Sequence, residues 1–163
     1  MRVGIGVDLH PLVPGRPLVL GGVTVPFDRG LAGHSDADVL SHAVIDGLLG
    51  AAGAGDIGRV FGVDDPTRAG ASSLGLLAEA RSLVAGRGYR VVNVDATICA
   101  EAPRLTPHFP AMQANLAVAL RVEAAAVNVK ATTAKGLGLL GRGEAIQALA
   151  IVSVARAPAR RRS

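Results

Sequence analysis

Aromatic residues, cysteines and long apolar runs are all scarce in this sequence of 163 residues. With no Trp, one Tyr and three Phe, the core must be built from Val, Leu, Ile and Ala, and few rings are available for stacking on nucleic-acid bases. The single Cys99 permits no internal disulfide. No apolar run approaches the roughly 20 residues of a membrane-spanning helix, and no signal peptide is recognisable. We therefore expect a cytoplasmic protein without membrane partners.

Positive charge is concentrated at the end of the chain. Four of the 17 Lys and Arg residues stand at positions 156, 160, 161 and 162, and the remaining 13 match the 13 Asp and Glu residues. We therefore predict a basic flexible tail over 156–163 and no nucleic-acid partner. Residues 1–155 are predicted to form one domain, which is long enough to bury about 70% of its unfolded surface.

Hydrophobic periodicity predicts a mixture of strands and helices. Arg2–His10 alternates strictly, which is typical of a strand with Gly4, Gly6, Asp8 and His10 on one face. The two glycines leave room there for another backbone. The further predicted elements are a hairpin over 17–27 turning at Gly21–Gly22, a helix ending near Gly53, a ligand-holding loop over 56–66, a helix from Ser72 or Ser73 to Gly86, a strand over 91–100, a rigid loop over 101–107, a helix over 108–120, a strand over 127–133, a glycine-rich connection over 136–143, and a helical turn or strand over 144–154. This order favours an α+β fold in which helices cover one face of a mixed β-sheet.

Residues 33–46 change from a polar loop into an apolar helix. Ser35 followed three positions later by Asp38 predicts a capping box at the start of this helix. Asp38, His42 and Asp46 then share one narrow stripe, while almost every other position is apolar. A helix of this kind is buried. Its polar stripe must face partners, because an unpaired polar group out of water costs about 1–3 kcal/mol.

Asp8, His10 and His42 form a candidate metal site. Side chains two apart on a strand lie on the same face, about 6.6 Å apart along the axis, so Asp8 and His10 converge. Catalytic zinc uses three ligands drawn from His and carboxylate and keeps a fourth position open. The same donors also suit iron(II). Alternatively, His42 is a core histidine hydrogen-bonded to Asp38 or Asp46.

The glycine-rich segment Gly136–Gly141 matches the GxGxxG pattern of dinucleotide-binding proteins. A Rossmann unit also needs a following helix, another strand and an acidic residue about 20 positions later, and the remaining sequence does not provide them. We predict instead a tight turn whose backbone passes close to a phosphate beside Thr132 and Thr133. Arg142 and Glu144 could form a buried ion pair or contact a ligand.

Six short motifs occur together in this sequence: DLH at 8–10, GHSD at 33–36 followed by Asp38 and His42, GDIG at 55–58, APR at 102–104, VKATT at 129–133 and GRGE at 141–144. In order and spacing they resemble the 2-C-methyl-D-erythritol 2,4-cyclodiphosphate synthase family over residues 2–154. The resemblance implies a bacterial-type cytoplasmic enzyme of the non-mevalonate route to isoprenoid precursors. It also implies a homotrimer packed around its sheets, with active sites between adjacent subunits.

The resemblance assigns roles position by position. Asp8, His10 and His42 match the zinc ligands, His34 and Thr133 match catalytic positions, and Asp46 and Asp38 stand behind the ligands. Segments 100–106 and 131–133 match the neighbouring subunit's pocket for the cytosine and its phosphates, and Arg142 and Glu144 match residues of the trimer's central channel. The substrate-binding positions that match are Asp8, Leu9, His10, His34, Ser35, Asp56, Ile57, Gly58, Ala100, Glu101, Ala102, Pro103, Arg104, Leu105, Thr106, Ala131, Thr132, Thr133, Lys135, Leu139 and Arg142.

The implied reaction is a metal-dependent, cyclising release of CMP. The 2-phosphate of 4-diphosphocytidyl-2-C-methyl-D-erythritol 2-phosphate attacks the β-phosphorus of its own diphosphate, giving 2-C-methyl-D-erythritol 2,4-cyclodiphosphate and CMP. Three positions depart from the family pattern. Lys135 stands where an acidic residue usually binds Mg²⁺ or Mn²⁺, Val63 stands where an acidic residue is common, and Leu139 stands where phenylalanine is frequent.

Two other functions fit the same residues. The first is a non-catalytic zinc-containing trimer that binds a nucleotide or an isoprenoid diphosphate. The second is a zinc-dependent phosphohydrolase, which would need a water-activating base near the metal. The products formed from the cytidyl diphosphate substrate distinguish these alternatives from the cyclase.

Overall fold

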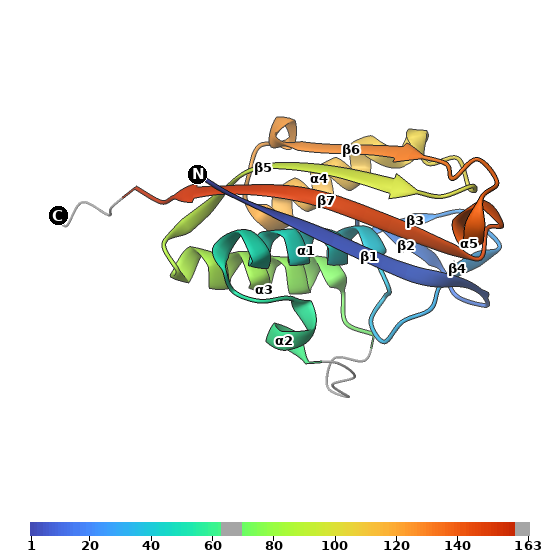
Figure 1. The fold of residues 1–163 in the computed structure, drawn as a ribbon, viewed down its shortest axis with the longest axis horizontal. Helices are drawn as coiled ribbons and strands as arrows, with labels where there is room; N and C mark the ends of the chain where they lie inside the picture. Colours follow the sequence, from blue (N-terminus) through green and yellow to red (C-terminus); the bar gives the residue numbers. More distant parts are fainter. Residues whose placement is uncertain (63–69, 159–163) are drawn as a thin grey trace.

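A five-stranded mixed sheet forms the centre of the protein, whose computed structural model describes residues 1–62 and 70–158 (Figure 1). Its strands are β1 (Arg2–Pro14), β4 (Arg29–Leu31), β5 (Tyr89–Cys99), β6 (Val127–Thr132) and β7 (Ala145–Arg156). They lie in the order β4-β1-β7-β5-β6, with β5 and β6 parallel and the other neighbours antiparallel. The helices α1 (Val39–Ala52), α3 (Ser73–Gly86) and α4 (Phe109–Leu120) cover one face, which confirms the predicted architecture.

Shorter elements connect this framework. The predicted hairpin is present as β2 (Leu18–Leu20) and β3 (Val23–Val25), and Gly21 and Gly22 both have positive φ, as a two-residue hairpin turn requires. The other short elements are the helices α2 (Ile57–Phe61) and α5 (Gly138–Gly141) and the 3₁₀ turns η2 (Thr106–His108) and η3 (Ala124–Ala126). Neither α2 nor β4 was predicted, because each is too short to show a period. The last segment is strand β7 rather than a helical turn.

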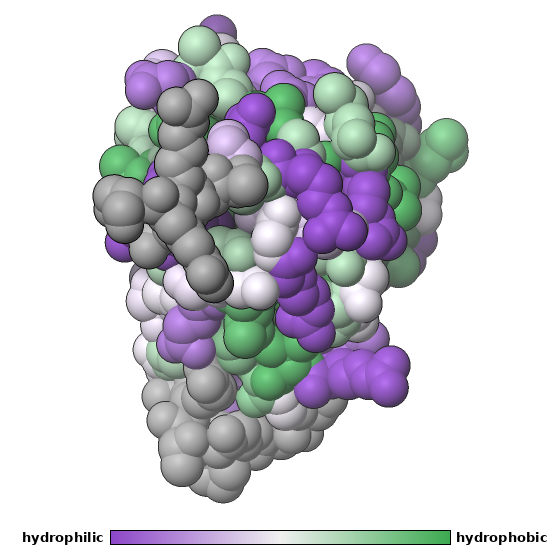
Figure 2. All heavy atoms as spheres, turned by 90° about the vertical axis from the view of Figure 1, so that its left-hand side faces the viewer, coloured by the Kyte–Doolittle hydropathy of each residue, from purple (hydrophilic) through white to green (hydrophobic). Residues whose placement is uncertain are grey.

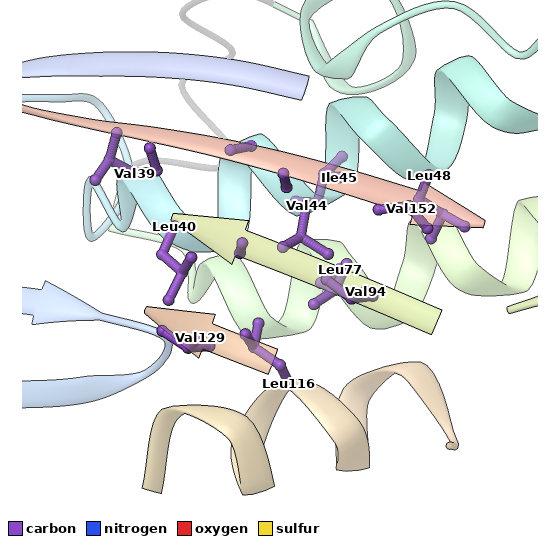
Figure 3. Close-up of a cluster of buried hydrophobic side chains, with 14 of the residues drawn as sticks. Val39, Leu40, Val44, Ile45, Leu48, Leu77, Val94, Leu116, Val129 and Val152 are labelled. Atoms are coloured by element: carbon purple, nitrogen blue, oxygen red, sulfur yellow. The ribbon is translucent and has the colours of Figure 1, made fainter. Parts of the chain in front are cut away.

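The core lies between the sheet and the helices and is mostly aliphatic, with Phe61 and Met112 as exceptions among its buried residues (Figure 3). Val44 and Leu48 of α1 point towards Val94 and Val152 of the sheet, and Leu77 of α3 joins them. Twelve of the 14 residues of α1 are buried, including His42, so this helix is enclosed as its sequence predicts.

Two glycines of β1 bring α1 very close to the sheet. A Cβ added to Gly6 would lie 1.9 Å from the carbonyl oxygen of Ala43, and one added to Gly4 would lie 2.1 Å from that of Gly47. Any larger residue would therefore push the helix away. This close contact confirms the predicted room for a second backbone, and it places His42 of the helix beside the polar side chains of β1.

The start of α1 differs from the prediction. Its N-cap is Asp38, whose Oδ1 accepts a hydrogen bond of 3.0 Å from Ser41 N. Ser35 makes no capping box, because Ala37 takes a left-handed conformation with φ of 57° and the chain turns before the helix begins. Ser35 Oγ instead accepts a hydrogen bond from Ala37 N. The predicted end at Gly53, with φ of 67°, is confirmed.

Arg2 at the start of β1 and Arg156 at the end of β7 both lie beside Tyr89. Arg156, predicted to begin the tail, is the last residue of β7, and its guanidinium lies 4.6 Å from the Tyr89 ring centre, with that of Arg2 at 5.5 Å. Figure 2 views this end of the molecule and shows hydrophilic side chains over much of it. The remaining predicted tail, residues 159–163, lies outside the described residues, as do Val63 and the acidic loop over 63–69. Among the helices that the structure describes, none combines the length and apolarity needed to cross a bilayer.

Candidate metal centre

Asp8, His10 and His42 converge on one point between β1 and α1. The distance from Asp8 Oδ2 is 2.9 Å to His10 Nε2 and 3.0 Å to His42 Nδ1, and the two nitrogens lie 3.2 Å apart. Among the described residues, this is the one cluster of three or more His, Cys, Asp and Glu side chains with metal-binding geometry. The convergence predicted from the strand and helix patterns is therefore present.

Hydrogen bonds on the far sides of the two rings show which nitrogens face inward as acceptors. His10 Nδ1 lies 2.6 Å from the carbonyl oxygen of Ala32, which can only accept, so Nδ1 carries the proton and Nε2 presents its lone pair to Asp8. His42 Nε2 lies 2.9 Å from Ser73 Oγ. Ser73 donates its own proton to Asp36, so its oxygen accepts from His42 Nε2–H and leaves a lone pair on Nδ1.

These three groups fit a divalent metal ion. One carboxylate and two neutral imidazoles would face one another as acceptors only, an arrangement that needs a cation or an added proton between them. Ligand atoms bound to zinc at about 2.0–2.1 Å in tetrahedral geometry lie about 3.3 Å apart. The observed separations of 2.9–3.2 Å are slightly shorter than this spacing. The donor set also suits iron(II), so the geometry supports a divalent metal without identifying it.

The pKa values of the metal-free chain also indicate that a positive charge is favoured at this site. Burial favours protonated Asp8, but the hydrogen bonds and charges of His10 and His42 outweigh burial and hold the pKa of Asp8 well below its usual range. Burial likewise opposes a charge on His10, yet the carboxylate of Asp8 raises the pKa of His10 above its ordinary value. Without metal, a proton on His10 supplies part of the missing positive charge.

Asp38 and Asp46 occupy different positions from the metal ligands. The Asp38 carboxylate is fully buried and accepts hydrogen bonds from Gly21 N, Gly22 N and both the N and Oγ of Ser41. It therefore ties the β2–β3 hairpin to α1. Asp46 Oδ1 accepts a hydrogen bond of 2.7 Å from Ile57 N, which fixes the start of α2. That Asp46 orients His42 stays a prediction.

The loop that carries His34 and Ser35 is held on both sides. Arg16 donates hydrogen bonds of 2.8 Å to the carbonyl oxygens of Gly33 and Ser35. On the other side, Asp36 N donates to Ala71 O, and Gly70 N donates to His34 O. The Ser35 hydroxyl lies 3.2 Å from His42 Nε2, which places this predicted substrate-binding group beside the metal centre.

Residues 56–58, which the resemblance assigns to substrate binding, form the start of α2 with Asp56 as its N-cap. Asp56 caps this helix by accepting a hydrogen bond of 2.8 Å from Arg59 N. The bond from Ile57 N to Asp46 joins this segment to α1 four residues beyond His42. The structure therefore brings three predicted segments, 8–10, 33–35 and 56–58, to one side of α1.

The remaining predicted substrate residues form a second group beyond the ends of β5 and β6. Ala100 N donates to Thr132 O, Gly136 N donates to Glu101 Oε1, and Lys135 N donates to Thr133 Oγ1. Strand register aligns Leu9, Gln147, Cys99 and Thr132 in one row across the sheet. Two strand spacings, about 10 Å, therefore separate Leu9 from Cys99, and three spacings, about 14 Å, separate Leu9 from Thr132.

Arg142 and Glu144 form an ion pair, but a buried pair is not what the structure shows. Arg142 Nε lies 2.6 Å from Glu144 Oε1, and the two side chains are 59% and 56% exposed. Their mutual hydrogen bond raises the pKa of Arg142 and lowers that of Glu144. Leu139, two residues before α5 ends, is also exposed. These side chains are therefore available to another molecule.

Two residues beside the metal centre were missed by sequence reasoning. Asp36 belongs to the GHSD motif but had no assigned role, and Ser73 was considered only as a helix start. Their connection to His42 depends on the loop over 33–36 meeting the start of α3, a contact between segments far apart in the sequence. A buried serine at the first position of a helix is the one local signal that could have suggested it.

The fold and the site together define a small α+β protein with a divalent-metal centre between its sheet and its central helix. The model of the YgbB family matches residues 1–155, and the chain belongs to this family. A relative from Aromatoleum aromaticum named 2-C-methyl-D-erythritol 2,4-cyclodiphosphate synthase is 57% identical over 155 residues, covering 95% of this chain and 94% of the relative.

Two solved structures show the same fold. The bifunctional IspDF of Campylobacter jejuni has a TM-score of 0.92 and 39% identity, over 95% of this chain and 42% of that one. IspF of Plasmodium falciparum, in complex with CDP, has a TM-score of 0.84 and 29% identity, over 96% of this chain and 97% of that one.

Proposed function

We propose that this protein converts 4-diphosphocytidyl-2-C-methyl-D-erythritol 2-phosphate to 2-C-methyl-D-erythritol 2,4-cyclodiphosphate and CMP, as a metal-dependent phosphorus–oxygen lyase of the non-mevalonate pathway. The convergence of Asp8 Oδ2, His10 Nε2 and His42 Nδ1 is the observation that carries this proposal. Membership of the YgbB family, relatives that carry the synthase name and a neighbour in complex with CDP support it.

Proximity and charge stabilisation are what this reaction requires. The attacking oxygen belongs to a phosphate that is already anionic, so no strong general base is needed. A new bond forms between that oxygen and the β-phosphorus, the bond from the β-phosphorus to the oxygen of the α-phosphate breaks, and CMP leaves with the electron pair. A zinc ion held by Asp8, His10 and His42 would supply Lewis-acid stabilisation of a phosphate oxygen.

The side chains around the metal centre would orient the reacting groups. His34 and Ser35 would hold the methylerythritol phosphate, and Asp56 and Gly58 would hold the ribose. The hydroxyl of Thr133 would donate a hydrogen bond to the phosphate oxygens as charge develops on them. The support for these roles is the position of the two loops, which Arg16 and Asp46 fix against α1.

We infer that the active protein is a homotrimer whose sheets pack together. The sheet face opposite the helices carries large apolar side chains that are 37% to 65% exposed in a single chain, namely Val3, Ile5, Val7, Leu9, Leu149 and Ile151. An apolar surface of this kind is typical of a subunit interface. Counted in strand spacings from β1, residues 100–106 lie about 10 Å and residues 131–135 about 14 Å away in their own chain. A neighbouring subunit could therefore provide the nucleotide pocket.

Lys135 makes a second metal site on this chain unusual. It has a φ of 55° and is exposed at the end of the turn after β6. A charged lysine cannot bind Mg²⁺ or Mn²⁺, so its ammonium group would replace part of that ion's charge, or phosphate oxygens and water would hold the ion. Activity of wild type and Lys135→Glu across a magnesium titration tests the idea. We expect a stronger magnesium requirement in the variant, and identical dependence would refute replacement.

Incubating the zinc-loaded protein with the cytidyl diphosphate substrate tests the proposed function. The expected products are CMP and the cyclic diphosphate, separated by chromatography and identified by ³¹P NMR. CMP with a linear phosphate product would instead indicate a phosphohydrolase. Tight substrate binding without CMP would indicate a non-catalytic binding protein. The Asp8→Asn variant provides the control, because it should bind nucleotide and release no CMP.

A further inference from the structure

His42 is held on its outer edge by two side chains that the proposed reaction does not use. Its Nε2 lies 2.9 Å from Ser73 Oγ, and Ser73 Oγ donates in turn to Asp36 Oδ1. Asp36 Oδ2 accepts a second hydrogen bond, of 3.0 Å, from Ser73 N. The chain of hydrogen bonds therefore runs from the ring of a metal ligand to a carboxylate through one hydroxyl.

The direction of these hydrogen bonds follows from their last member. An ionised carboxylate can only accept, so Ser73 uses its single proton on Asp36 and its oxygen can only accept from His42. When Nδ1 binds a metal ion, His42 therefore keeps its proton on Nε2, where Ser73 accepts it; without the ion, Asp8 Oδ2 lies 3.0 Å from Nδ1 and can accept from the other tautomer. Nδ1 is the atom that faces Asp8 and His10. Such outer partners fix the tautomer and orientation of metal-bound histidines.

Ser73 and Asp36 are rigidly placed. Ser73 is the first residue of α3 and is completely buried. Asp36 is held by its backbone as well, since Asp36 N donates to Ala71 O. Neither side chain depends on substrate for its position, so the pair would hold His42 in the same orientation throughout a catalytic cycle.

Ser35 contacts the same nitrogen of His42 but is placed differently. Its hydroxyl lies 3.2 Å from His42 Nε2 and also accepts from Ala37 N. It belongs to the loop that carries His34, and its oxygen also lies 3.5 Å from Ser73 Oγ, a long contact. Because this contact holds the Ser35 proton weakly, the hydroxyl can donate it to an anionic ligand while Ser73 continues to hold the ring.

We propose that Asp36 and Ser73 are positioning residues that fix His42 as an Nδ1 metal ligand and thereby free the Ser35 hydroxyl to bind a substrate phosphate. This assignment rests on the proposed function for the role of Ser35, whereas the orientation of His42 can be tested without substrate. The prediction is a division between two neighbouring serines: Ser73 determines metal affinity and Ser35 determines substrate affinity.

The first measurement is the state of the His42 ring in the zinc-loaded protein, from long-range ¹H–¹⁵N NMR and the exchange rate of its Nε2 proton with solvent. Wild type and Ser72→Ala should both show zinc on Nδ1 and a slowly exchanging proton on Nε2. Ser72 is the matched control, because it is the adjacent exposed serine and its side chain makes no capping hydrogen bond. Ser73→Ala and Asp36→Asn should show a faster-exchanging Nε2 proton. An Nε2 proton that exchanges as slowly in Ser73→Ala as in wild type would overturn the proposal.

The second measurement is zinc affinity by competition with a chromophoric chelator, together with KM and kcat. Ser73→Ala and Asp36→Asn should bind zinc about 10- to 100-fold more weakly, the range found when outer partners of metal ligands are removed. Ser73→Thr keeps the hydroxyl and should restore most of the affinity. Ser35→Ala should retain zinc affinity within about threefold and raise KM about tenfold, the loss of one charge-assisted hydrogen bond.

The outcomes separate the two hypotheses. Equal zinc affinity in wild type and Ser73→Ala would overturn the positioning role even if the enzyme is active. Wild type that binds zinc through Nδ1 of His42 but does not form the cyclic product would refute the proposed function and leave the orientation of His42 established. Loss of zinc affinity in Ser35→Ala equal to that in Ser73→Ala would contradict the division between the serines. Circular dichroism of each variant excludes general misfolding.

Discussion

Two carboxylates contact the first turn of α1, Asp38 at Ser41 and Asp8 at His42, and their hydrogen-bond partners differ. Asp38 receives four hydrogen bonds from N–H and O–H groups inside the chain, although burial still raises the pKa of its carboxyl group. Asp8 faces two imidazole nitrogens that present lone pairs, so its charge is matched only by a cation or a proton. The first arrangement is complete without a ligand, and the second is not.

This difference distinguishes a structural polar cluster from a functional one. Both clusters are largely buried, and residue types alone do not separate them, because each contains an aspartate beside a helix. What separates them is the balance of donors and acceptors. The balance also explains why Asp38 and His42, neighbours on one stripe of α1, serve different purposes.

Asp8→Asn, a conservative substitution at the metal centre, should have the largest effect of the variants considered, and this effect should be on activity. Asp8→Asn should lower kcat at least about 1000-fold, since Lewis-acid stabilisation is worth several kcal/mol. It should lower zinc occupancy in parallel, as measured by elemental analysis. The metal-free variant should also lose the stabilising contribution that the lowered pKa of Asp8 provides, as measured by denaturant unfolding. Full activity in Asp8→Asn would contradict the metal centre.

Asp38→Asn makes the same change in the Asp38 cluster. It should lower the unfolding free energy and leave zinc affinity nearly unchanged. An amide in place of the carboxylate turns one acceptor into a donor among buried N–H groups, so we expect a loss of about 2–4 kcal/mol of unfolding free energy. Denaturant unfolding measures this loss. Zinc affinity of the folded protein should change by less than about threefold. A stable variant with weakened zinc binding would show that the two clusters are not distinct.

The pH dependence of stability should differ with and without metal. In chelated protein the raised pKa of His10 gives a stabilising contribution that is complete below the ordinary value of 6.5 and is lost as pH rises through the folded pKa. The lowered pKa of Asp8 gives a second stabilising contribution. It is complete above the ordinary pKa of 3.8 and is lost as pH falls through the folded pKa of Asp8. Chelated protein should therefore show a Tm that falls as pH rises above about 6.5.

Zinc-loaded protein provides the comparison for that measurement. Because the ion replaces the proton, its Tm should stay level over the same range, and at a thousandfold excess over Kd zinc should add about 4 kcal/mol of stability. If Tm changed with pH in the same way in zinc-loaded and chelated protein, the idea that zinc replaces the proton on His10 would be wrong.

Asp46→Asn should have the smallest effect. Its amide oxygen can still accept from Ile57 N, so the cost in unfolding free energy should be at most about 1 kcal/mol. We expect zinc affinity within about threefold of wild type, in contrast to Ser73→Ala. A tenfold loss of zinc affinity in Asp46→Asn would instead support the predicted role of Asp46 in orienting His42.

Much of the fold could be predicted because it depends on periodicity and turn chemistry. The alternation of β1, the Gly21–Gly22 turn and the apolar helix ending at Gly53 are all local signals, and each is confirmed. The metal ligands could be proposed for the same reason, since Asp8 and His10 share a strand face. Their partnership with His42 was proposed from the strand and helix patterns, was supported by the resemblance to a family, and is present in the structure.

The parts that could not be predicted depend on tertiary contacts. The capping box failed because Ala37 turns the chain with a positive φ, which its residue type does not signal. Asp38 was placed behind the metal ligands, but the hairpin glycines and Ser41 use its carboxylate. Alternation in β1 identified two faces without showing that the apolar one is exposed. The trimeric assembly and the cytoplasmic location stay predictions.

Anomalous diffraction from crystals grown with zinc tests the central claim most directly. The account predicts one zinc peak per chain, bonded to Asp8 Oδ2, His10 Nε2 and His42 Nδ1 at about 2.0–2.2 Å, with His42 Nε2 still hydrogen-bonded to Ser73. Zinc absent from this point, or bound through Nε2 of His42, would contradict it.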